Sequence, residues 1–145
     1  MDFEYVVLPS IKFFIAVIVG ALIGWDREKK GKPAGLKTHA LVCLGATIVT
    51  QIGILMYKSS ISGDQMRVAA QIVSGLGFLG AGVIMTRSDN KVTGLTTAAT
   101  LWLCGCMGIC IGSDFYYLVL PAFVAYFVVS HILVKFETNH NGNND

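Results

Sequence analysis

The residues that could carry chemistry gather at the ends of apolar stretches. Asp26, Arg27 and Glu28 form an acid-base-acid run directly after the first apolar stretch, and His39 lies at the start of the second. These groups could form a polar node at one mouth of a helical bundle. An ordinary solvated loop is the alternative, because basic residues collect at one end of membrane spans. The residues alone leave both interpretations open.

Further polar residues lie within the apolar stretches. Gln71 carries an amide, which needs a hydrogen-bond partner in hydrocarbon, and a threonine of the stretch 94–111 could supply it. Arg67 either points into the bundle or extends to the membrane surface. Thr97 and Thr100 share one face of a helix in that same stretch.

Other patterns argue against an enzyme. No Asp or Glu lies in the middle of an apolar stretch, although a dedicated Mg²⁺ or Ca²⁺ site usually includes carboxylate oxygens. No nucleophile-base pair and no phosphate-binding loop are evident. The four cysteines lie in apolar stretches and are read as packing residues. We therefore expect no catalytic residues, no metal ligands and no cofactor.

One pattern resembles a nucleotide-binding motif. Gly75, Gly77 and Gly80 match G-x-G-x-x-G, but no strand precedes them and they lie inside an apolar run of membrane-spanning length. Close helix packing is the favoured interpretation. A locally unwound helix that lines a cavity is the alternative.

Composition indicates an integral membrane protein. Of the 145 residues, 54% are hydrophobic and 14% charged, and the mean hydropathy is +0.64. Basic residues are not interleaved with exposed aromatic residues, which excludes a nucleic-acid partner. The acidic start of the chain does not fit a cleaved signal peptide, so we expect the first apolar stretch to be retained.

The apolar stretches predict one all-α transmembrane bundle over residues 1–136, followed by a polar tail at 137–145. Its five spans are expected at about 5–25, 38–57, 67–86, 94–111 and 115–134. Eight Lys and Arg residues would then lie on one side and three on the other. This bias predicts an outside N-terminus and a cytoplasmic C-terminus in a multi-pass protein.

Small residues define the expected packing faces. In the first span they recur at four-residue steps and lead to Arg27. In the span 67–86 a wide small-residue face predicts the central helix of the bundle. The residues expected to mediate helix packing are Ala16, Gly20, Gly24, Gly75, Gly77, Gly80, Gly82 and Gly94. The central face of the span 67–86 comprises Arg67, Ala70, Ser74, Gly77 and Ala81.

Four motifs together resemble the MgtC/SapB family of bacterial membrane proteins. They are G-A-L-I-G-W-D-R-E at 20–28, P-A-G-L-K-T-H-A-L-V at 33–42, A-A-Q-I-V-S-G-L-G-F-L-G-A-G-V-I at 69–84 and G-L-T-T-A-A-T-L-W at 94–102. The resemblance covers four of the five expected spans. It implies a protein of the bacterial inner membrane that is linked to growth in low magnesium and, in pathogens, to virulence. It also implies the F-type ATP synthase as a membrane protein partner.

Two functions follow from these patterns. The first is a non-enzymatic regulator of magnesium and ion homeostasis that binds membrane partners, or a second copy of itself, through small-residue faces. The second is a transporter or channel with a polar path between the second, third and fourth spans. The polar residues expected to matter are Asp26, Arg27, Glu28, Thr38, His39, Arg67, Gln71, Ser74, Thr96, Thr97 and Thr100. The expected transport path is lined by His39, Thr50, Gln71, Ser74, Thr97 and Thr100.

Overall fold

The computed structural model describes residues 3–59, 64–86 and 91–133. Its helices are α1 (Phe3–Lys29), α2 (Leu36–Lys58), α3 (Gln65–Val83), α4 (Leu95–Gly112) and α5 (Tyr116–Phe127), and α5 continues as a π-helix, η1 (Val128–Leu133). Five helical segments are long and apolar enough to cross a membrane, which confirms the predicted all-α five-span class. The polar tail expected at 137–145 lies outside the described residues.

Helix α3 begins and ends earlier than the predicted span 67–86, and two short strands follow it. Strands β1 (Met85–Thr86) and β2 (Val92–Thr93) pair antiparallel, with Met85 opposite Thr93. Gly94 then begins α4 with φ +91°, a left-handed conformation in which a side chain would overlap the Val83 carbonyl. The periodicity of the apolar residues predicted the span, but it gave no signal for these two paired strands.

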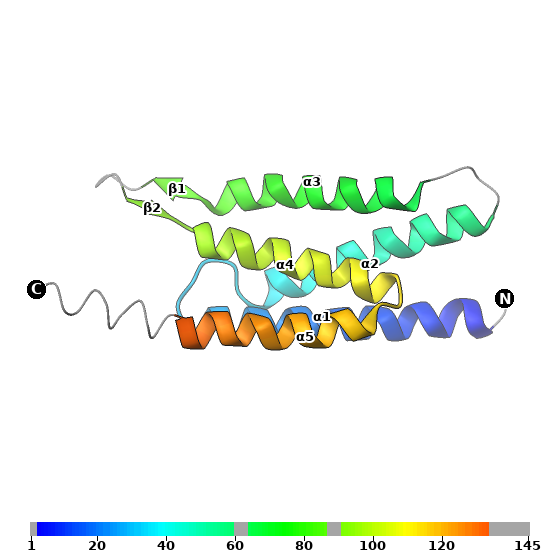
Figure 1. The fold of residues 1–145 in the computed structure, drawn as a ribbon, viewed down its shortest axis with the longest axis horizontal. Helices are drawn as coiled ribbons and strands as arrows, with labels where there is room; N and C mark the ends of the chain where they lie inside the picture. Colours follow the sequence, from blue (N-terminus) through cyan, green and yellow to red (C-terminus); the bar gives the residue numbers. More distant parts are fainter. Residues whose placement is uncertain (1–2, 60–63, 87–90, 134–145) are drawn as a thin grey trace, which may run out of the picture.

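Helix α4 is the centre of the bundle. It lies between α3 on one side and the pair α1 and α5 on the other, while α2 crosses beside it (Figure 1). Its share of buried residues is the highest among the five spans. Sulfur, aliphatic and aromatic side chains from α1, α2, α4 and α5 form the shared core, with Ile23, Cys104 and Ile111 among those that solvent does not reach.

The prediction that the span 67–86 is central is therefore wrong for the single chain. Of the residues in α3, only Leu76 and Gly80 are buried. Both face α4, where Gly105 leaves room for the Leu76 side chain and Ala98 packs against Gly80. Only a narrow strip of α3 packs against α4, so the wide small-residue face of α3 stays exposed.

Close helix contacts occur instead along α1, α2 and α4. A Cβ atom at Gly24 would lie 2.6 Å from the Gly35 carbonyl oxygen and 2.6 Å from the Leu36 Cα atom. Similarly, a Cβ atom at Gly112 would lie 2.7 Å from the Thr50 Cβ atom. Glycine is thus required where backbones approach this closely.

Candidate functional site

Arg27 enters the interior of the bundle near the first turn of α4. Only 3% of its surface is exposed, since it continues the packed face of α1 by one turn. Its Nη2 atom donates a hydrogen bond of 3.3 Å to the Thr97 hydroxyl. Its Nε atom is buried and has no hydrogen-bond partner within the described part of the chain. A cation so enclosed is costly, so it makes this end of the bundle a candidate functional site.

His39 links α2 to α4 beside this arginine. The imidazole is fully buried, with Nδ1 3.0 Å from the Gly35 carbonyl oxygen and Nε2 3.2 Å from the Thr100 hydroxyl. The Thr100 hydroxyl also donates to the Thr97 carbonyl oxygen at 2.9 Å. A hydroxyl has one proton, so beside a neutral ring whose Nδ1 donates to Gly35 that proton is divided between Nε2 and the Thr97 carbonyl oxygen. His39, Thr97 and Thr100 therefore form one connected polar network.

The acid-base-acid run separates into three directions. Arg27 points inward, whereas the Glu28 carboxylate accepts a hydrogen bond of 3.0 Å from the Leu36 backbone N–H and so caps α2. Asp26 turns toward α5, where it accepts hydrogen bonds from the Tyr126 hydroxyl at 2.7 Å and from Lys30 at 2.9 Å. The run joins three helices instead of forming one cluster.

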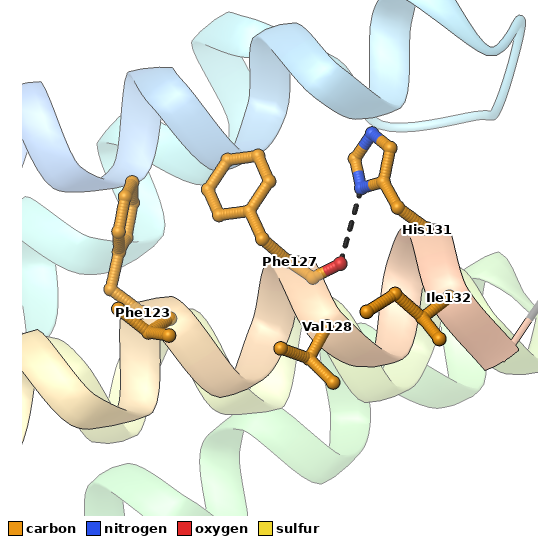
Figure 2. Close-up of a pocket in the computed structure, with 6 residues that line it drawn as sticks. Phe123, Phe127, Val128, His131 and Ile132 are labelled. Atoms are coloured by element: carbon orange, nitrogen blue, oxygen red, sulfur yellow. Dashed lines mark hydrogen bonds between the residues drawn. The ribbon is translucent and has the colours of Figure 1, made fainter.

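Asp26 also reaches the π-helical turn η1. Its carboxylate lies 3.1 Å from the Ser130 hydroxyl, which donates to it, and 3.2 Å from Nε2 of His131. Figure 2 shows the His131 ring beside Phe127, whose carbonyl oxygen lies 3.2 Å from Nδ1 of the histidine. The hollow there, about 420 Å³, is lined by α5 and η1 alone and is apolar apart from the histidine. Its lining offers no reactive group beyond that ring.

Sequence reasoning missed a second set of polar contacts between α2 and α4. The Thr47 hydroxyl donates a hydrogen bond of 2.9 Å to the Gly108 carbonyl oxygen, and the Gln51 amide donates to the Gly112 carbonyl oxygen. The polar residues of α2 recur at three- and four-residue steps, which was the available signal. These groups hold α2 and α4 together.

The polar residues of α3 do not join this network. Arg67, Gln71 and Ser74 are exposed, and so is Thr96 at the start of α4. Gln71 lies instead in a groove of about 600 Å³ between α2 and α3, which Lys37 and Thr38 of α2 also line. The residues predicted to line a transport path are thus separated. Four are buried in the interior, Gln71 lies in the groove, and Ser74 is exposed outside the groove.

The glycines of α3 differ in their surroundings. Ala98 packs against Gly80, with its Cβ atom 3.5 Å from where a Cβ atom of Gly80 would be. At Gly75, Gly77 and Gly82 nothing lies within 4 Å of that position.

Within the described ranges, no group of three His, Cys, Asp or Glu residues is placed to hold a metal ion.

Comparison with known proteins gives a consistent result. The model of the MgtC family matches residues 13–139. Protein MgtC of Brucella abortus is 46% identical over 100 residues, which cover 68% of this chain and 40% of that protein. The putative magnesium transporter YhiD of Escherichia coli is 40% identical over 111 residues, or 73% of this chain and 51% of YhiD.

Protein SapB of Bacillus subtilis is 39% identical over 113 residues, covering 73% of this chain and 48% of SapB. The chain thus spans about half the length of the curated relatives that it matches. No solved structure matches it.

Proposed function

Because the chain belongs to the MgtC family, we propose that it serves magnesium and ion homeostasis in the bacterial inner membrane by docking a transmembrane helix of another protein. This function is regulatory and non-enzymatic. The protein is a multi-pass membrane protein, and two of its relatives are named protein MgtC and putative magnesium transporter YhiD. The protein would act through contact between its own helices and a partner helix within the bilayer.

The exposed small-residue face of α3 carries this proposal. Ala70, Ser74, Gly77 and Ala81 recur at three- and four-residue steps, and all four are exposed in the single chain. In lipid, helices associate where small residues let their backbones approach closely. The equivalent stripe on α1 already packs against α2, whereas nothing within the described residues covers the stripe on α3. A helix from a partner fits this surface.

The closed interior supports the same conclusion. His39, Thr97 and Thr100 are bonded to one another or to backbone carbonyls, and Thr47 and Gln51 are bonded to α4. A transporter of the predicted kind would expose these groups along a path. The observation that favours transport is the groove containing Gln71 and Thr38, and ion flux through liposomes that falls in Gln71→Leu would support that second candidate.

Growth in low magnesium tests the docking face. Gly77→Leu and Ala81→Leu place a bulky side chain on the exposed stripe, and we expect both to abolish complementation of a strain that lacks the gene. Gly77→Ala keeps the surface small and should complement fully. Ala125→Leu is the matched control, because Ala125 is an exposed small residue on α5.

Co-purification in mild detergent identifies the partner. By resemblance, the membrane sector of the F-type ATP synthase is the first candidate. We expect wild type and Gly77→Ala to retain the partner and Gly77→Leu to lose it. Full growth of well-expressed Gly77→Leu and Ala81→Leu cells would refute the docking proposal.

A further inference from the structure

The groove between α2 and α3 is wedge-shaped. Near one end the helices touch, since a Cβ atom at Gly53 would lie 3.2 Å from a methyl carbon of Val68. Toward the other end α2 slopes away from α3 and toward α1 (Figure 1). There nothing lies within 4 Å of a Cβ position at Gly45 or Gly75. The groove thus opens toward the start of α2.

The walls of the groove are apolar and its polar groups lie near the two ends. The volume is about 600 Å³. It is lined by Lys37, Thr38, Leu41, Val42, Gly45, Ala46 and Val49 of α2 and by Gln71, Ile72, Gly75, Leu76 and Leu79 of α3. Along α2 the lining extends for ~18 Å at the rise of a helix. This length is close to the ~15 Å of hydrocarbon in one leaflet.

The open end carries positive charge. Lys37 is exposed and lies in the first turn of α2, where the N-cap residue Gly35 provides no side-chain hydrogen bond and no acidic residue is present. The Glu28 carboxylate from α1 bonds to the Leu36 backbone N–H. Lys37 and Thr38 both line the groove. Because the Glu28 carboxylate already occupies the N-terminal end of α2, the charge of Lys37 is what suits a phosphate there.

We propose that this groove binds an anionic glycerophospholipid of the bilayer, with one acyl chain between α2 and α3 and its phosphate at Lys37 and Thr38. The charge at its open end distinguishes a lipid from an apolar helix, because Lys37 lines the groove there and suits an anionic headgroup. An acyl chain is narrow, and lipid is the medium into which the groove opens.

Lipid retention by the purified protein tests the headgroup contact. The protein in detergent is mixed with dioleoyl phosphatidylglycerol or dioleoyl phosphatidylcholine, and native mass spectrometry counts the bound lipids. We expect one phosphatidylglycerol to be retained preferentially. Lys37→Gln should lower this preference about fivefold, whereas Lys32→Gln in the exposed loop should leave it unchanged. Equal retention of both lipids by the wild type would overturn the proposal.

A second pair of variants tests the acyl-chain contact. Gly75→Leu fills the groove and should abolish retention of the lipid, and Gly45→Leu does the same from α2 if the first variant folds poorly. Gly77→Leu, on the same helix but outside the groove, should retain it. Glycerol phosphate should not displace the lipid, because it lacks the chains.

Other results would assign the groove differently. Retention of lipid by both Gly75→Leu and Gly45→Leu would refute the site. A wild-type dimer that Gly75→Leu dissociates would show that a second copy occupies the groove. These measurements do not depend on helix docking at Gly77, so the two proposals can fail separately.

Discussion

At the scale of single residues, the bundle encloses charges that a bilayer does not readily accept. Lys12 is 8% exposed within α1, and its ammonium forms an ion pair of 2.7 Å with Asp114 in the turn between α4 and α5. The same ammonium lies 3.4 Å from the Gly112 carbonyl oxygen. In the sequence, Lys12 counts only as one of the three basic residues expected on the outer side. Its partner is 102 residues away in the chain, so no local pattern could reveal the pair.

Neutralising the partner of Lys12 should destabilise the protein. Asp114→Asn keeps a side chain that tolerates the φ of +65° at this position, but it leaves the buried ammonium without its counterion. We expect the free energy of unfolding in detergent to fall by about 1 kcal/mol, a modest value because Asp114 is mostly exposed.

Removing both charges provides the control for this ion pair. Lys12→Met combined with Asp114→Asn should recover most of the lost stability, because no buried charge remains. An Asp114→Asn protein as stable as the wild type would show that the ion pair contributes nothing measurable.

At the scale of helices, the position of each glycine decides what it does. Gly20 and Gly24 face the backbone of α2, and Gly108 and Gly112 face α2 from the other side, so three helices approach at close range. The glycines of α3 outside Gly80 meet nothing within the described residues. The same residue type therefore closes the core in α1 and α4 and leaves an open surface in α3.

Substituting alanine at two glycines should separate these roles. Gly24→Ala places a methyl group 2.6 Å from backbone atoms of Gly35 and Leu36, which cannot move without parting α1 from α2. We expect a loss of about 1–3 kcal/mol in the free energy of unfolding. Gly45→Ala is the matched control. Its methyl group meets nothing within 4 Å, and it should gain up to ~1 kcal/mol from helix propensity. Equal thermal stability of the two variants would contradict the close contact.

At the scale of the whole molecule, α4 is the element on which the other helices assemble. It contacts α1, α2, α3 and α5, and its first turn lies beside Arg27 and His39. The proposed docking face on α3 and the proposed lipid groove lie on the outer side of this arrangement. Interior contacts thus fix the bundle, while the outer surfaces of α3 remain free to interact with the membrane and its proteins.

The orientation of the bundle in the membrane is a prediction for the whole chain. Eight basic residues on one side against three on the other favour a cytoplasmic C-terminus. A C-terminal fusion to green fluorescent protein should therefore fluoresce, and a fusion to alkaline phosphatase should be inactive. Alkaline phosphatase inserted between α2 and α3 should be active as the control. The reverse pattern would show that the bundle is inverted.

The sequence by itself determined the fold class, the number of spans and the buried faces of two helices. A span needs about 20 apolar residues, and hydrocarbon favours helix faces that hide polar groups inside the bundle. On α4, Thr97 and Thr100 are buried on the face that their spacing predicted, and on α1 the small residues Gly20 and Gly24 are buried on theirs.

Only the tertiary structure decided which helix is central and which polar groups meet. Small-residue stripes occur on α1, α3 and α4 alike, and spacing does not say which stripe finds a partner within the chain. The close approach of α1, α2 and α4 uses two of them and leaves the stripe on α3 exposed. Which stripe is buried depends on how all the helices pack together, because a helix contact in lipid needs two complementary surfaces.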